Sequence, residues 1–160
     1  MSSLLSLVVE TTDPRPSKLA KILGKDQKEV EKELAELQEN KTILGWMPIL
    51  NPEKAGVERV RAVIEVKISP EREGGFDRMA LRVSKFDEVE SCYLMSGGYD
   101  LLVFVSGNNL NSVATFISER LATIEGVLST STHFLLRPYK ELNHMLVQAG
   151  TINEKPPVSP

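Results

Sequence analysis

The feature that most constrains the fold is an unbroken apolar run, Leu101 to Val105, that closely follows an alternating segment. In the segment from Val89 to Met95, successive side chains switch between two faces, and Ser96-Gly97-Gly98 separates it from the run. This pattern predicts two strands joined in a hairpin. A strand without a polar face is covered on both sides, so the sequence predicts a sheet with a layer on each face.

The turn of this hairpin carries residues that suit either a tight turn or a ligand site. Gly97 and Gly98 permit positive φ and a close approach to the backbone. Tyr99 adds a ring and a hydroxyl, and Asp100 adds an acceptor that suits an ammonium group. Taken alone, these residues favour a turn in which Asp100 bonds to neighbouring backbone. A ligand site is the alternative.

The segments on either side of the hairpin are predicted to be two further strands and two helices. Val60 to Ser69 alternates as a strand, and apolar residues at helical spacing follow from Phe76 to Val83. After the hairpin, Asn108 or Asn109 can cap a helix that Gly126 stops, and a strand runs from Val127 to Leu136. The order is the βαββαβ of ferredoxin-like domains. Its two helices cover one sheet face only, so we expect a second sheet, from a homodimer, on the other.

Three helices are predicted before this domain. The first spans Leu4 to Val9, the second begins at Pro16 and is closed by Gly24, and the third is capped by Asp26 and runs to Asn40. Only Gly24-Lys25 separates the last two, which is the spacing of a helix-turn-helix.

The segment after these helices is predicted to be extended. Thr42 to Ile49 reads as an arm or wing in which Trp46 is a buried anchor, and Asn51 to Val57 reads as a linker. The predicted organisation is therefore a helix-turn-helix domain at 1–50, a linker at 51–57, the βαββαβ domain at 58–140 and an extended tail at 141–160.

Composition narrows the functional classes. The 160 residues include 26% charged residues and carry a net charge of −3, so there is no overall attraction to nucleic acid, and no run reaches the roughly 18 apolar residues of a membrane helix. No export signal is visible, and the single Cys92 cannot form an internal disulfide. We expect a cytoplasmic protein that needs no membrane, metal or cofactor.

Three short motifs follow one another along the chain. They are Asn51-Pro52-Glu53-Lys54-Ala55-Gly56 at the linker, Gly97-Gly98-Tyr99-Asp100 at the hairpin and Gly126-Val127-Leu128-Ser129-Thr130-Ser131-Thr132 on the last strand. Together they resemble motifs of the leucine-responsive/asparagine (Lrp/AsnC) family of bacterial and archaeal regulators. The resemblance covers roughly Leu4 to Lys140. The main departure at the hairpin is Gly98, where the family often has Asp.

The resemblance implies an α+β protein with an N-terminal winged helix-turn-helix domain and a C-terminal ferredoxin-like βαββαβ domain of the RAM type. It implies a homodimer with back-to-back sheets, often assembled into tetramers or octamers. It also implies that the protein is a regulator and not an enzyme. A small effector, usually an amino acid, would lie between dimers near the hairpin turn. The residues that match this site are Gly97, Gly98, Tyr99, Asp100, Thr130 and Thr132.

The resemblance also implies operator DNA as a partner, although the third helix departs from the family pattern. Glu33 and Glu36 stand where relatives commonly carry Arg, and a carboxylate near phosphate adds repulsion. The residues predicted to meet DNA are Lys18, Lys25, Gln27, Lys28, Glu31 and Lys32. The alternative is a sensor or assembly module of the same ancestry that no longer binds DNA.

A third hypothesis is enzymatic, because relatives with this two-domain plan include decarboxylases that act on sirohaem. That chemistry would use His and Arg side chains to hold tetrapyrrole carboxylates. The available residues are His133, Arg137 and His144, which are few and scattered in the sequence. The sequence shows no specific nucleophile triad, carboxylate pair or phosphate loop. A regulator is therefore the favoured hypothesis.

Overall fold

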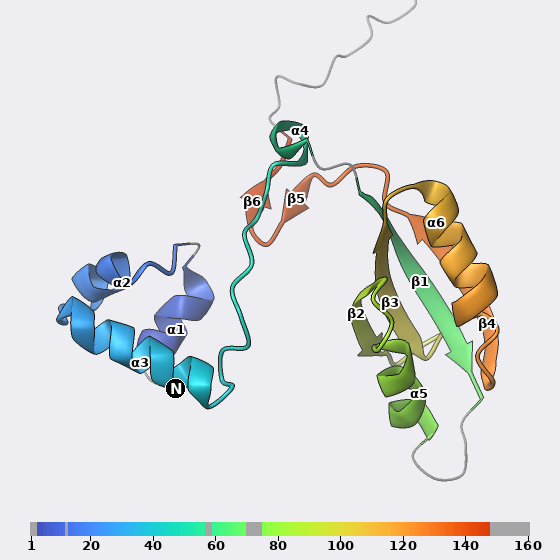
Figure 1. The fold of residues 1–160 in the computed structure, drawn as a ribbon, viewed down its shortest axis with the longest axis horizontal. Coiled ribbons are helices and arrows are strands. Elements are labelled where there is room, and N and C mark those ends of the chain that lie inside the picture. Colours follow the sequence, from blue (N-terminus) through green and yellow to red (C-terminus); the bar gives the residue numbers. More distant parts are fainter. Residues whose placement is uncertain (1–2, 12, 57–58, 70–74, 148–160) are drawn as a thin grey trace, which may run out of the picture. The chain divides into compact units, whose positions relative to one another are not determined.

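The computed structural model describes residues 3–11, 13–56, 59–69 and 75–147. The chain divides into two compact units, Met1–Pro48 and Ile49–Pro160, which are considered separately below. The first unit contains helices and the second contains the main sheet (Figure 1).

The first unit confirms the three predicted helices, α1 (Ser3–Glu10), α2 (Pro16–Leu23) and α3 (Gln27–Glu39). Each helix turns an apolar stripe inward, as periodicity of this kind requires. The buried residues that form their common core are Leu4, Leu19, Ala20, Val30 and Leu34.

The turn between α2 and α3 is fixed by local caps. Gly24 ends α2 in the left-handed conformation with φ 65°, and the Lys25 N–H donates to the Ala20 carbonyl at 3.1 Å. The Asp26 side chain begins α3 by accepting from the Lys28 N–H at 2.8 Å. These caps hold the two helices in a helix-turn-helix.

The predicted wing does not form a strand in the described residues 41–51. Leu44 and Met47 are 87% exposed, and Trp46 is 47% exposed, so the expectation that Trp46 is a buried anchor is wrong. Among the described residues no strand pairs with this arm, and an unpaired strand gains no ladder hydrogen bonds. The predicted linker contains a short helix, α4 (Pro52–Ala55).

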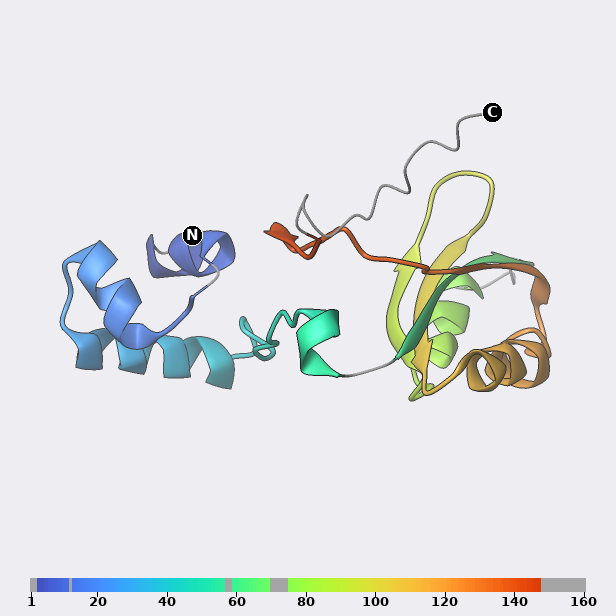
Figure 2. The same cartoon turned by 90° about the horizontal axis from the view of Figure 1, so that it is seen from above.

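The second unit confirms the predicted βαββαβ order. Its strands are β1 (Val60–Ile68), β2 (Val89–Leu94), β3 (Leu101–Gly107) and β4 (Val127–Phe134), which form one antiparallel sheet in the order β2-β3-β1-β4. Helix α5 (Gly75–Val83) follows β1, and α6 (Leu110–Thr115) follows β3 (Figure 1). The loop between β2 and β3 extends from one end of the sheet (Figure 2).

The helix after β3 has two parts. Asn109 caps α6 by accepting from the Ser112 N–H at 2.8 Å, and the Ser112 hydroxyl accepts from the Asn109 N–H in return. The helix then continues as a π-helical stretch, η1 (Phe116–Leu121). Phe116, Ile117 and Leu121 of η1 are buried against the sheet.

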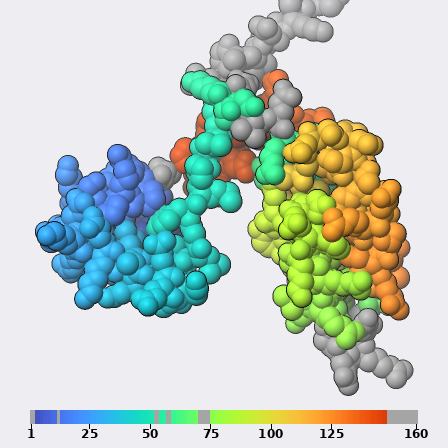
Figure 3. All heavy atoms as spheres, in the orientation of Figure 1, coloured from blue at the N-terminus to red at the C-terminus, as the bar shows by residue number. Residues whose placement is uncertain are grey.

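One face of the sheet is packed against both helices. Ile64 pairs with Val103 and Val66 pairs with Leu101, and all four side chains are fully buried. Met79 and Val83 of α5 join the same core as the buried residues of α6 and η1. The two helices, lime and amber, form the outer layer over this core (Figure 3).

The opposite face carries the alternate side chains of the same strands. Val63 pairs with Phe104, and Tyr93 pairs with Leu102. The rings of Tyr93 and Phe104 meet edge to face with centroids 6.1 Å apart, while Tyr93 stays 53% exposed. The unbroken apolar run of β3 therefore supplies one row to the helix-covered core and a second row to a partly exposed face.

The described part of the predicted extended tail forms a hairpin. Lys140–Glu141 (β5) and His144–Met145 (β6) pair as a small hairpin, whose two-residue turn has positive φ at Leu142 and Asn143. Such turns match the twist of a hairpin. Residues 148–160 lie outside the described chain.

Asp100 connects the hairpin loop to β1. Its Oδ2 accepts a hydrogen bond from the Ile68 N–H at 2.8 Å, and its own N–H donates to the Val66 carbonyl at 3.0 Å. The Met95 N–H in turn donates to the Asp100 carbonyl at 2.8 Å. Asp100 therefore connects three segments, which are the end of β1, Met95 after β2 and the start of β3.

Replacing Asp100 with Ala should lower the stability of the ligand-free protein, because it leaves the Ile68 N–H at the end of β1 without this acceptor. We expect a loss of about 1–3 kcal/mol, measured by thermal or denaturant unfolding. Asp100→Asn keeps an acceptor oxygen and should lose less, while the exposed Asp87→Ala serves as a control. Unchanged melting of Asp100→Ala would disprove this role.

Candidate functional site

The residues predicted to meet DNA lie on α2, α3 and the turn between them. Lys18 lies on α2, Lys25 lies in the turn, and the others lie on α3. The side chains are exposed, except that Lys25 is half-buried. The exposed members on α3 are Gln27, Lys28, Glu31 and Lys32. The structure thus places all six on the helix-turn-helix.

Most of these cations face carboxylates of their own unit. Lys25 Nζ lies 3.0 Å from Glu33 and 3.5 Å from Glu29, and its hydrogen bond to Glu33 raises its pKa. Lys32 Nζ lies 3.9 Å from Glu36. In the described part of the chain, the Lys28 side chain makes no ion pair. Lys28 is therefore the most available cation of α3.

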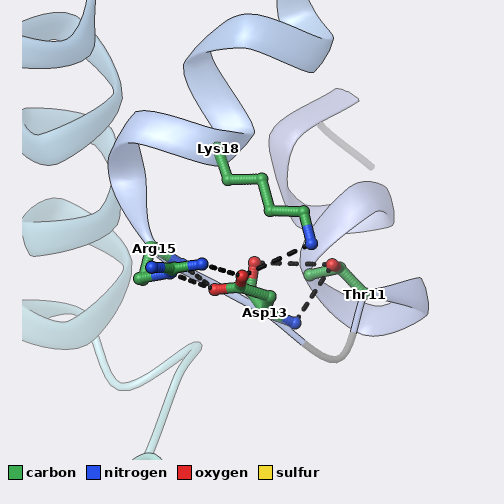
Figure 4. Close-up of polar contacts among 4 residues, drawn as sticks. All are labelled: Thr11, Asp13, Arg15 and Lys18. Carbon is green, nitrogen blue, oxygen red and sulfur yellow. Dashed lines mark hydrogen bonds and ion pairs between the residues drawn. The ribbon is translucent and has the colours of Figure 1, made fainter.

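A second charged cluster precedes α2 and was not anticipated from the sequence. Asp13 accepts from Arg15 through two atoms, Nε at 2.7 Å and Nη2 at 2.5 Å, and from Lys18 Nζ at 3.3 Å (Figure 4). The hydrogen bond from Arg15 holds the pKa of Asp13 well below its usual range, and Asp13 raises the pKa of Arg15. Like a phosphate, this carboxylate engages both cations.

A cavity of about 330 Å³ lies in the first unit beside α3. Its wall is mainly apolar and includes the half-exposed ring of Trp46, with Arg15 and Glu31 as charged members. The remaining lining residues are Pro14, Pro16, Leu34, Ala35 and Gln38. Glu31, which the sequence assigns to DNA contact, therefore also borders this cavity.

The predicted effector residues fall into two groups. Gly97, Gly98, Tyr99 and Asp100 share the loop between β2 and β3, where Gly97 has φ +147° and a Cβ on Gly98 would meet nothing within 4 Å. This loop is open enough for a ligand to approach its backbone. The Asp100 carboxylate already binds β1 through Oδ2, and Oδ1 accepts no hydrogen bond from the described residues.

The two predicted threonines lie on the far side of β1 from this loop. Thr130 pairs with Val66, whose carbonyl accepts from the Asp100 N–H, whereas Thr132 pairs with Ile64, further along β1. Thr130 and Asp100 thus flank the same residue, separated by one strand. The structure brings Thr130 level with the loop and leaves Thr132 further away.

A cavity of about 270 Å³ lies in the second unit. It is bordered by the segment after β4, the β5–β6 hairpin and the start of β1. The lining residues are Leu50, Ala55, Arg59, Arg61, Leu135, Leu136, Pro138, Glu141 and Leu146. No sequence pattern indicated this cavity, because it combines segments that are far apart along the chain.

The residues considered for tetrapyrrole chemistry make contacts with their own neighbours. His133 Nε2 lies 3.4 Å from Glu65, and His144 Nδ1 lies 3.0 Å from the Leu142 carbonyl. Arg137 is exposed in the segment after β4. The described residues contain no group of three side chains suited to hold a metal ion, and none of their helices is long and apolar enough to cross a membrane.

Comparison with known proteins identifies transcriptional regulators. A family model described as the Lrp/AsnC ligand binding domain matches residues 61–145. An uncharacterized helix-turn-helix transcriptional regulator of Bacillus subtilis, YugG, is 38% identical over 160 residues, which is 99% of this chain and 96% of the relative. The similarity therefore includes both units.

Solved structures share the fold. Escherichia coli AsnC superposes with a TM-score of 0.63 at 17% identity, over 86% of this chain and 91% of that chain. A Neisseria meningitidis regulator solved as a complex with L-methionine gives a TM-score of 0.61 at 23% identity, over 89% of both chains. The family match, the full-length relative and the shared fold agree. This chain belongs to the Lrp/AsnC family of helix-turn-helix transcriptional regulators.

Proposed function

We propose that this chain binds operator DNA through α2 and α3 as a homodimer or larger assembly, and that an amino acid effector at the loop between β2 and β3 modulates that binding. The observation that carries the proposal is the capped helix-turn-helix with Gln27 and Lys28 exposed at the start of α3. In this motif the N-terminal residues of the second helix reach base edges.

The charge of α3 defines how such binding would work. The helix has two lysines against five glutamates, a net charge of −3. Phosphate neutralisation supplies most non-specific affinity, so this helix should bind random DNA weakly. Gln and Lys side chains can still form hydrogen bonds to bases in the major groove. DNA recognition would then depend on a few positions, with Lys28 the leading cation.

The effector proposal rests on the open loop. Gly97 and Gly98 leave its backbone accessible, and Asp100 Oδ1 remains available to an ammonium group. The Neisseria relative was solved with L-methionine, which has the required α-ammonium and α-carboxylate. A second subunit would complete the site, as expected for a ligand held between dimers.

The second candidate function is a sensor or assembly module without DNA binding. Glu33 and Glu36 favour it, because they place carboxylates beside Lys25 and Lys32. The two functions differ in one property, the affinity of the full chain for duplex DNA.

The DNA proposal predicts that Lys28→Ala flattens the salt dependence of duplex binding by about one ion, because one phosphate contact is lost. Lys32→Ala should have a smaller effect, since Lys32 faces Glu36. Lys41→Ala, outside the three helices, is the control. Fluorescence anisotropy at several salt concentrations measures these slopes. No binding even at low salt would favour the module without DNA binding.

The effector proposal predicts that Gly98→Asp strengthens amino acid binding, because it adds an acceptor for the ammonium group. The φ of Gly98 is not positive and its Cβ position is open, so the loop accepts a side chain. One charge-assisted hydrogen bond should give about a tenfold gain in a calorimetric titration. Gly97→Asp adds the same charge at a residue with φ +147°, where a side chain strains the backbone, and it serves as the comparison variant. Absence of heat from all twenty amino acids with both the native protein and Gly98→Asp would exclude this effector class.

A further inference from the structure

The 270 Å³ cavity of the second unit lies at the opposite end of β1 from the proposed effector loop. Arg61 near the start of β1 lines the cavity, whereas Ile68 at the end of β1 binds Asp100. Seven residues of extended strand separate these positions by roughly 23 Å. The cavity is therefore distinct from the loop site.

The charged wall of this cavity is held in place by an ion-pair network. Arg61 Nη1 donates to both oxygens of Glu141 at 3.1 and 3.2 Å, and Arg61 Nε donates to Glu90 at 3.1 Å. Burial acts to lower the pKa of Arg61, but the two carboxylates outweigh it and raise that pKa. Arg61 thus fixes the β5–β6 hairpin against the sheet and is paired with two carboxylates.

Arg59 is the other cation of the cavity, and it differs from Arg61. In the described residues the Arg59 guanidinium has no ion pair. The one carboxylate that lines the cavity, Glu141, already accepts from Arg61, so Arg59 is the cation of the wall that can meet a ligand. Most of the remaining wall is aliphatic and includes Leu135, Leu136 and Leu146.

We propose that this cavity binds a small aliphatic monocarboxylate, with the carboxylate on Arg59 and the chain against the leucines. Guanidinium and carboxylate form a paired, charge-assisted contact, and a mainly apolar wall with one charged group is typical of a small-molecule site. An α-amino acid fits less well, because its ammonium group would lie near two guanidinium groups while Glu141 already accepts from Arg61.

The size of the cavity sets the size of the ligand. At about 270 Å³ the cavity lies just below the roughly 300–1,000 Å³ of sites for drug-sized molecules, so it suits a small ligand. A branched 2-oxo acid such as 4-methyl-2-oxopentanoate has this size. L-Leucine has the same carbon skeleton with an ammonium group in place of the keto oxygen, so it serves as the matched comparison ligand.

Isothermal titration of the full chain with 4-methyl-2-oxopentanoate tests the proposal. We expect Arg59→Gln to weaken binding about tenfold or more, because the carboxylate loses its charged partner. Arg137→Gln removes the same charge from a residue outside the cavity and should bind within about twofold of the native protein. Leu136→Asp is a second variant that should also weaken binding, at a side chain that is 95% exposed and so tolerates substitution.

Hydrogen exchange of the same samples locates the ligand. Protection of amides in residues 135–146, without protection in residues 95–100, is the expected result. The proposal is overturned by absence of heat with the native protein, by equal affinity of Arg59→Gln and the native protein, by tighter binding of L-leucine, or by protection confined to residues 95–100. These readouts do not involve DNA, so they separate this proposal from the proposed regulatory function.

Discussion

The second face of the sheet is the constraint on which the rest of this molecule depends. Each strand carries two rows of side chains, and α5 and α6 cover only one of them. Phe104 and Leu102 extend the apolar character of β3 to the other face, beside the exposed ring of Tyr93. The same face also carries Glu65 beside Leu102, so it is mixed, and its exposed apolar part suits an interaction surface. A second copy that covers it would give a dimer, which is also the form in which a helix-turn-helix protein meets two half-sites.

The helix-turn-helix unit imposes a second physical limit. Its lysines and glutamates largely neutralise each other, and Asp13 occupies Arg15 and Lys18 as a phosphate would. Weak non-specific attraction to DNA would follow, because few unpaired cations remain to displace counterions from the phosphates. Selectivity would then rest on Gln27 and Lys28, which precede the acidic second half of α3. Pairing two units in a dimer would compensate for the low affinity of each.

The sequence predicted features that depend on neighbouring residues. Gly24 and Asp26 fix their helix ends locally, and alternation in β1 shows which side chains meet the core. Features that depend on distant residues could not be read in this way. Asp100 accepts from Ile68, 32 residues away, and Arg61 binds Glu141, 80 residues away. The loop site was therefore visible as a motif, whereas the anchored role of Asp100 and the cavity beside Arg61 required the structure.

Sedimentation velocity of the full chain tests the central claim most directly. The account predicts that the native protein sediments as a dimer or larger species at micromolar concentration, and that Phe104→Glu sediments as a monomer, because a charge on this face opposes burial. Leu81→Glu, which changes an exposed residue of α5, should still assemble through the sheet. A monomeric native protein, or a Phe104→Glu variant that assembles like the native protein, would contradict the account.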